Sequence, residues 1–184
     1  MPCKIDPEKI EAAIAFHGHT CPGLAIGIRT AELAIDRLDI HPGSNVVCVT
    51  ETDMCAVDGI QFLTGCTFGK GNLVHRDYGK PGFTFFDRDA GKGFRALFLD
   101  DAVGEVPPEA GESPKQARTR TVMDADLGDL FRVSDISDPP VRPARILNSM
   151  VCERCSEKVM ESRIRRFDGR DLCIPCFRSR EQKV

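Results

Sequence analysis

The stretch F-H-G-H-T-C-P-G-L contains residue types that bind metals or react as nucleophiles. His17, His19 and Cys21 fall within five positions, directly before an apolar run. Pro22 suits the first turn of a helix, which places Cys21 at or near the N-cap. The unpaired N–H groups and the dipole at a helix N-terminus stabilise a thiolate, so we expect the pKa of Cys21 to be low. These residues predict either a transition-metal site or a thiol redox step.

Two further thiols are candidate members of the same site. Cys55 precedes a predicted helix and Cys66 follows it. Imidazole and thiolate donors together favour zinc, iron or copper, and the same atoms without metal could serve a thiol redox step. The alternative is that His17 caps a helix, His19 makes a core hydrogen bond and the cysteines only pack. We predict a metal site on His17, His19 and Cys21, with Cys55 and Cys66 as cofactor-binding residues that complete it.

The glycine-rich turn G-C-T-F-G-K-G-N adds one cation to the candidate site. It differs from a nucleotide-binding P-loop because the spacing from Gly65 to Gly69 is one residue short and Gly71 replaces the hydroxyl residue. The glycines could still bind an anion beside Lys70, which is otherwise a solvated lysine. The predicted catalytic residues are Cys21, His17, His19 and Lys70. The acids nearest in sequence, any of which could orient a histidine or act as a base, are Glu51, Asp53 and Asp58.

A second cysteine group lies near the C-terminus as two C-x-x-C pairs. Seventeen residues separate the pair Cys152 and Cys155 from the pair Cys173 and Cys176. This spacing is typical of a tetrahedral four-thiolate zinc site, and a module this small needs the metal to fold. Disulfides, free thiols and an iron or iron–sulfur centre are the alternatives. The predicted metal ligands here are therefore Cys152, Cys155, Cys173 and Cys176, around structural Zn²⁺.

Composition limits the class of protein. The chain has 184 residues, is 41% hydrophobic and carries a formal net charge of −3, so it has no basic footprint for nucleic acid. No apolar run reaches the length of a membrane span, and we expect no secretory signal. Nine cysteines, an odd number, favour a reducing cytoplasmic setting. Four arginines of the C-terminal module form either a solvated face or a nucleic-acid surface: Arg163, Arg165, Arg166 and Arg170.

The periodicity predicts an α+β domain with helices packed on a mixed or antiparallel sheet. We expect helices over 7–16, 21–38 and 55–64 and a helical turn over 126–131. Strands are expected over 45–52, 82–87, 93–99 and 131–136, and a surface loop or helix lead-in over 106–121. The expected domains are 1–136, a proline-rich connector over 137–149 and a four-cysteine zinc module over 150–184.

Three stretches resemble one known family. F-H-G-H-T-C-P-G-L-A-I-G-I-R, V-D-G-I-Q-F-L-T-G-C-T-F-G-K-G-N-L and R-D-Y-G-K are similar to the FmdE family, named after one of the subunits of formylmethanofuran dehydrogenase. The tail resembles the zinc-binding module of many FmdE-like members. The resemblance implies an α+β domain, a treble-clef or zinc-ribbon tail and a homodimer. It also implies that the candidate residues of the N-terminal domain line an active-site cleft.

The resemblance associates the chain with a redox system. The family is linked to a molybdenum or tungsten enzyme that reduces CO₂ onto methanofuran, with other redox subunits as partners. Members also occur without those subunits, so whether this chain is an oxidoreductase subunit stays open. One alternative is an accessory protein that binds a small ligand or a partner without chemistry. A zinc-ribbon regulator that binds nucleic acid is a further alternative, against which the acidic balance argues.

Overall fold

The computed structural model describes residues 2–104, 107–143 and 145–181. The chain divides into two compact units, Met1–Pro143 and Ala144–Val184. The boundary between them falls inside the proline-rich segment 137–149. No helix within the described ranges is both long enough and apolar enough to cross a bilayer.

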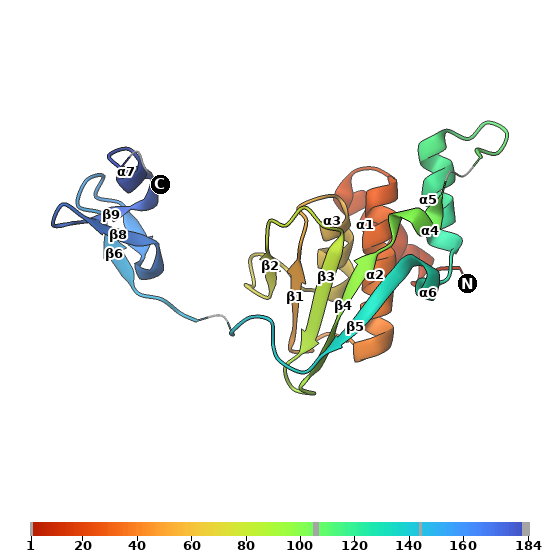
Figure 1. Cartoon of the computed structure of the whole chain (residues 1–184), viewed down its shortest axis with the longest axis horizontal. Coiled ribbons are helices and arrows are strands. Elements are labelled where there is room, and N and C mark those ends of the chain that lie inside the picture. Colours follow the sequence, from red (N-terminus) through yellow and green to blue (C-terminus); the bar gives the residue numbers. More distant parts are fainter. Residues whose placement is uncertain (1, 105–106, 144, 182–184) are drawn as a thin grey trace. The chain divides into compact units, whose positions relative to one another are not determined.

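The first unit is built on a five-stranded mixed sheet (Figure 1). Its order is β2-β1-β3-β4-β5, with β1 and β2 parallel and the other pairs antiparallel. The predicted hairpin is β3–β4, closed by a loop between Asp87 and Lys92. The strands are β1 (Val46–Thr50), β2 (Leu73–His75), β3 (Gly82–Asp87), β4 (Lys92–Phe98) and β5 (Phe131–Ile136). The α+β fold class is therefore confirmed, and β2 is a short parallel strand that the sequence pattern did not indicate.

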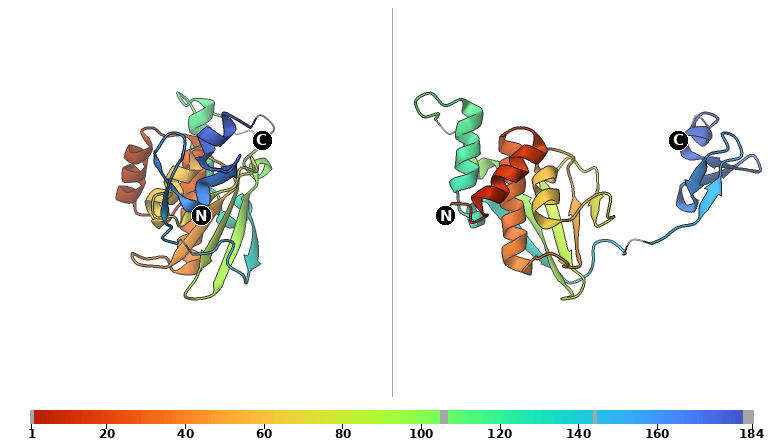
Figure 2. Two further views of the ribbon diagram at one scale, coloured as in Figure 1. Left: turned by 90° about the vertical axis from the view of Figure 1, so that its left-hand side faces the viewer. Right: turned by 180° about the vertical axis from the view of Figure 1, so that it is seen from behind.

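Helices cover one face of this sheet (Figures 1 and 2). The three helices nearest the N-terminus are α1 (Pro7–His17), α2 (Pro22–Leu38) and α3 (Ala56–Thr64). The apolar stripe of α2 packs on the sheet through residues such as Leu33, and Ile60 of α3 joins the same core as Phe85. Burial of these side chains provides the main stabilisation of the unit.

The backbones of α2 and α3 touch where they cross. A Cβ atom on Gly27 would lie 2.1 Å from the carbonyl oxygen of Ala56, and one on Gly59 would lie 3.0 Å from the backbone nitrogen of Ile28. No side chain fits at either position without moving a helix. Gly59, which weakens α3 in isolation, is therefore required by the contact between the two helices.

A second helical group follows β4 and includes α5, which packs beside α2. These helices are α4 (Asp100–Val103), α5 (Pro114–Asp124) and α6 (Leu127–Leu130). Ser113 and Gln116 form a reciprocal capping box and Pro114 takes the first position of α5. The expectation of a loop or lead-in over 106–121 is corrected from residue 114 onward, and residue 106 lies outside the described part.

A buried ion pair ties α2 to the end of α5. The Nη1 atom of Arg29 lies 2.9 Å from Oε2 of Glu32, and both side chains are almost wholly inaccessible to solvent. The Arg29 guanidinium also donates to the carbonyl oxygens of Met123 and Ala125. The backbone N–H of Lys4 donates to the Glu32 carboxylate at 2.9 Å. The pair thus joins three segments that are distant in sequence.

The second unit consists of two short hairpins and a helical turn. At the second hairpin Asp168 and Gly169 have φ angles of 50° and 75°, the left-handed conformation that this two-residue turn requires. The buried core contains only Cys152, Leu172 and Cys173 among the residues that the structure describes. The elements are β6 (Ser149–Val151), β7 (Lys158–Met160), η1 (Glu161–Arg163), β8 (Ile164–Phe167), β9 (Arg170–Cys173) and α7 (Ile174–Arg178).

Candidate metal centres

His17 is held in place by an acid on the neighbouring helix. It is the last residue of α1, which Gly18 ends in the left-handed conformation (φ 89°). Nδ1 of His17 lies 2.7 Å from Oδ2 of Asp58 on α3. This hydrogen bond is the main reason that the pKa of His17 is raised above its usual value. With a proton on Nδ1 directed to Asp58, Nε2 is the nitrogen that offers a lone pair.

Cys21 occupies the predicted N-cap of α2. Its Sγ accepts a hydrogen bond from the backbone N–H of Leu24 at 3.3 Å and lies 3.7 Å from Nε2 of His17. Burial alone would raise the pKa of this thiol, but the hydrogen bonds from Leu24, His17 and Cys55 outweigh burial and lower it. The thiolate form, which binds metals and reacts, is therefore favoured at this position.

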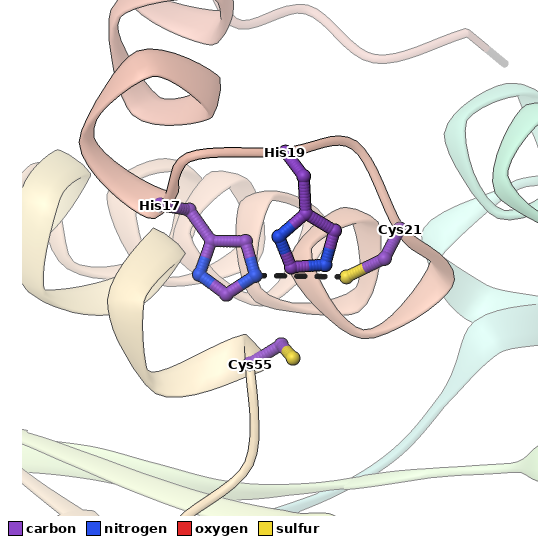
Figure 3. A group of neighbouring side chains, drawn as sticks. All are labelled: His17, His19, Cys21 and Cys55. Atoms are coloured by element: carbon purple, nitrogen blue, oxygen red, sulfur yellow. Dashed lines mark hydrogen bonds between the residues drawn. The ribbon is translucent and has the colours of Figure 1, made fainter.

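His19 and Cys55 complete a group of four converging donors (Figure 3). His19 lies in the connection between α1 and α2, with its ring centroid 4.5 Å from that of His17. Cys55 is the N-cap residue of α3, and burial followed by the neighbouring Cys21 thiol raises its pKa. The ligand atoms of His17, His19, Cys21 and Cys55 all lie within 4.8 Å of one another. We refer to these four residues as the N-terminal cluster.

The N-terminal cluster fits a four-coordinate transition metal. In a tetrahedral zinc site, donor atoms lie about 3.3–3.8 Å apart, because Zn–N and Zn–S bonds are about 2.0 and 2.3 Å long. The 3.7 Å between His17 and Cys21 falls in this range, and the whole group needs only a small contraction. Two imidazoles and two thiols are also the donor types that zinc and iron accept. The carboxylate behind His17 is the usual outer partner of a metal-binding histidine.

The N-terminal cluster opens onto a cavity of about 670 Å³. This volume is in the range of sites that take small organic molecules. His19, Cys21 and Cys55 lie on its wall, and its apolar lining comes chiefly from Pro22, Ile26, Met54, Pro81, Phe83 and Phe98. Three charged side chains, Asp100, Lys115 and Arg118, also line it. A metal on this cluster would therefore face a space that an organic molecule can enter.

The structure separates Cys66 from the cluster in which we expected it. Its thiol is buried in the apolar core and donates to the carbonyl oxygen of Val46 at 3.5 Å. Cys55 and Cys66 flank the two ends of α3, and a nine-residue helix is about 13 Å long. The two thiols therefore cannot bind one ion together while this helix is formed.

Lys70 also lies away from the N-terminal cluster. Its Nζ donates to the carbonyl oxygen of Gly65 at 3.1 Å, and it lines a different cavity together with Lys9 and His41. The glycine-rich turn is thus placed at the C-terminal end of α3, whereas the cluster is at its N-terminal end. The expectation that Lys70 joins the cluster is corrected by this placement.

The three candidate acids have different partners. Asp58 binds His17, so one of the predicted pairings is present. Glu51 forms a two-point ion pair with Arg95, at 2.6 and 2.7 Å, which lowers the pKa of this carboxyl group. Asp53 is exposed. Sequence reasoning missed Lys115 and Arg118, although their spacing of three on a helix places them on one face.

The C-terminal thiols form a second four-donor group, with all sulfur atoms within 4.8 Å of one another. Sγ of Cys155 lies 3.9 Å from Sγ of Cys173, close to the separation in a tetrahedral thiolate site. The backbone N–H of Cys173 donates to Cys152, and that of Cys176 donates to Cys173. Backbone hydrogen bonds of Cys155 and Cys173 lower the pKa of Cys152 to about 6. These four thiols build a metal site.

Comparison with known proteins agrees with both parts of the chain. A family model described as "FmdE, Molybdenum formylmethanofuran dehydrogenase operon" matches residues 16–132. The chain belongs to the FmdE family. A second model, "Prokaryotic dksA/traR C4-type zinc finger", matches residues 145–182 and therefore covers the C-terminal thiols. The resemblance seen in the sequence is thus confirmed for the family and for its zinc-finger tail.

Two individual proteins are similar to this FmdE-family chain. A "Probable S-adenosyl-L-methionine-binding protein" of Archaeoglobus fulgidus is 28% identical over 187 residues, covering 88% of this chain. The chain spans half the length of that relative. The crystal structure of an FmdE-like protein of tungsten formylmethanofuran dehydrogenase, from Syntrophus aciditrophicus, is similar with a TM-score of 0.69. It is 24% identical, with 94% of this chain and 92% of that chain covered, and so supports the fold.

Proposed function

We propose that this FmdE-family chain is a metalloprotein with two metal sites of different use. The C-terminal site is structural and holds Zn²⁺ on Cys152, Cys155, Cys173 and Cys176. The second site holds zinc or iron on the N-terminal cluster, and a small organic molecule binds beside it. We further propose that the protein serves a redox system related to formylmethanofuran dehydrogenase, as a subunit or an accessory protein.

One observation carries the proposal. Four soft donors from two helices and a loop converge within 4.8 Å on the wall of a cavity of about 670 Å³. A structural site is normally closed off from ligands, whereas a site that acts on a molecule needs access to it. The N-terminal cluster combines a full donor set with such access.

The residues around the N-terminal cluster suit this use. A bound zinc ion would polarise a ligand atom as a Lewis acid, and a bound iron ion would add electron transfer. Asp58 holds His17 in one orientation, and the start of α2 stabilises the Cys21 thiolate. His19 is exposed, and among the described residues no hydrogen bond to its ring is present. It is therefore the member of the cluster best placed to carry a proton or to leave the metal.

The family supplies the biological setting of the proposal. The matched family is described by a molybdenum formylmethanofuran dehydrogenase operon, which suggests redox subunits as partners and a cytoplasmic location. A homodimer and the domain limits 1–136, 137–149 and 150–184 belong to the same proposal. Whether the chain catalyses a reaction by itself depends on the N-terminal cluster, because four thiolates would fill the coordination sphere of zinc in the C-terminal module.

Metal analysis of the reduced full-length protein tests the proposal. We expect two metal ions per chain, falling to one in the double variant His17→Ala/Cys21→Ser. The matched control is His41→Ala/Cys3→Ser, which changes the same residue types outside both groups and should retain two ions. One ion per chain in the wild type, with no further ion taken up from added Zn²⁺ or Fe²⁺, would overturn it.

A second candidate function is the binding of S-adenosylmethionine without redox chemistry. The Archaeoglobus relative is named as a probable binder of this molecule, and the match covers most of this chain. The cavity of about 670 Å³ is large enough for a ligand of this size. Calorimetric titration of the metal-loaded protein with S-adenosylmethionine tests this candidate. Binding that survives in the His17→Ala/Cys21→Ser variant would favour it over the metal-dependent function.

A further inference from the structure

The cavity beside the N-terminal cluster has chemically different walls, and this difference indicates which class of molecule it binds. Donors on one wall come from the α1–α2 connection, the start of α2 and the start of α3. Charged side chains on another wall come from α4 and α5. Since α3 and α5 lie on the two sides of α2 (Figures 1 and 2), the two polar walls are separated.

The charged wall carries an excess of positive charge. Lys115 and Arg118 are three residues apart on α5 and therefore share a face of the helix, which lines the cavity. Arg118 is neutralised by an ion pair with Asp100, at 2.5 Å. Lys115 makes no ion pair with any carboxylate of the described residues. One net positive charge thus remains at this wall.

The space between the two polar walls is apolar. Ile26 from α2, Phe83 from β3 and Phe98 from β4 line it, and the two phenylalanines are almost completely buried beneath it. Hydrocarbon or aromatic groups displace water favourably from such a surface. A small inorganic anion would leave this surface uncovered, whereas a molecule with an apolar body would cover it.

From this arrangement we infer that the cavity binds an organic anion, with its carboxylate or phosphate at Lys115 and its apolar body against Ile26, Phe83 and Phe98. The inference rests on the proposed function for the other end of the ligand, which faces the metal. Lys115 is then the residue that selects an anion over a neutral molecule of the same shape. Arg118 and Asp100 position α5 against α4 and contribute no net charge.

Three probes of equal body distinguish the possibilities: phenylbutanoate, its neutral amide and phenylbutyl phosphate. Their dissociation constants are measured by calorimetry on the full-length metal-loaded protein at low and at physiological salt. We expect an anion to bind about fivefold or more tightly than the amide, because a single exposed charge contact has about this strength. The better of carboxylate and phosphate identifies the anion, and the preference should shrink as salt is added.

Variants assign the preference to Lys115. Lys115→Gln should reduce the affinity for the anion to that for the amide and leave the amide unchanged. Lys115→Arg should keep the preference. Lys9→Gln, an exposed lysine that lines the other cavity, is the matched control and should have no effect. Equal affinities for the three probes, no binding of any at millimolar concentration, or an unaltered preference in Lys115→Gln would each overturn the inference.

A metal-free variant separates this inference from the proposed function. Cys21→Ser/Cys55→Ser removes both sulfur donors of the N-terminal cluster but leaves Lys115 and the apolar surface in place. The anion preference should persist in it, with weaker overall binding. A protein with two metals and no anion preference would contradict only the inference. A protein with one metal and a preserved preference would contradict only the proposed metal site.

Discussion

The two four-donor groups of this chain resemble each other in size but differ in what surrounds them. In each, the donor atoms lie within 4.8 Å. The C-terminal thiols lie in a unit whose described buried core is three residues, two of them predicted metal ligands. The N-terminal cluster lies on a unit with a large core of its own, formed between helices and a sheet. The comparison teaches that similar ligands stabilise one fold and merely use the other.

Access is the second difference between the groups. The N-terminal cluster mixes imidazoles with thiols and opens onto a cavity of about 670 Å³. The C-terminal group is all sulfur, and its ligands receive backbone hydrogen bonds within the module. The four predictions that follow test whether metal is needed for folding in one unit and only for function in the other.

The largest expected effect is the loss of the second unit in Cys173→Ser. Structural zinc contributes about 10–16 kcal/mol to folding in small zinc modules, far more than a three-residue core supplies. Two-dimensional NMR of the full chain should show collapsed signals for 145–181 and unchanged signals for the first unit. Cys3→Ser, outside both groups, serves as the control. A folded second unit in the Cys173→Ser protein would break the comparison.

A large effect is also expected in the first unit, but without metal. Arg29→Met leaves the Glu32 carboxylate buried beside an apolar side chain. Breaking a buried ion pair costs about 3–5 kcal/mol. Urea unfolding of the metal-free full chain should show this loss in the transition of the first unit. Arg37→Met, on the same helix but in a solvent-exposed pair with Asp135, should cost about 1 kcal/mol or less. Equal costs for the two variants would contradict the assignment.

A smaller effect is expected on metal affinity when the partner of His17 is changed. Asp58→Asn keeps the shape but removes the charge that orients the imidazole. Loss of such an outer partner lowers metal affinity about 10–100-fold. Competition with a chelator measures the affinity of the N-terminal cluster, and Asp53→Asn is the matched control on an exposed acid. An unchanged affinity would mean that Asp58 does not support a metal ligand.

The smallest effect is expected for Cys55→Ser on the stability of the metal-free first unit. The side chain is only partly buried, and substitutions at such positions usually change the free energy of unfolding by about 0.5 kcal/mol. Metal binding at the cluster should nevertheless be lost. Urea unfolding and metal analysis of the same sample measure both quantities. A drop of several kcal/mol would mean that the cluster stabilises the unit, as its C-terminal counterpart does.

Much of the site could be predicted from the sequence because its donors are local. His17, His19 and Cys21 are close in the chain, and the proline after Cys21 fixes the helix start. The C-terminal thiols follow a spacing with few alternative folds. The main strands and helices also carry clear periodicity, so the α+β class followed from pattern alone.

The rest depended on how separate elements pack. Which of Cys55 and Cys66 joins the cluster depends on the orientation of α3, and periodicity does not give the direction of a helix relative to its neighbours. The choice of Asp58 over Glu51 was open for the same reason. Lys115 reaches the cavity only because α5 packs beside α2, a contact between residues far apart in sequence.

The contact of Gly27 with Ala56 has a consequence for the order of events as the protein matures. Cys21 and Cys55 begin the two helices that meet at this contact, so their sulfur atoms become neighbours only after α2 and α3 have docked. In a newly made chain the C-terminal knuckles, each formed by adjacent residues, can capture an ion at once. The N-terminal cluster has to wait for its helices, so the last ion to enter the protein is the one beside the cavity.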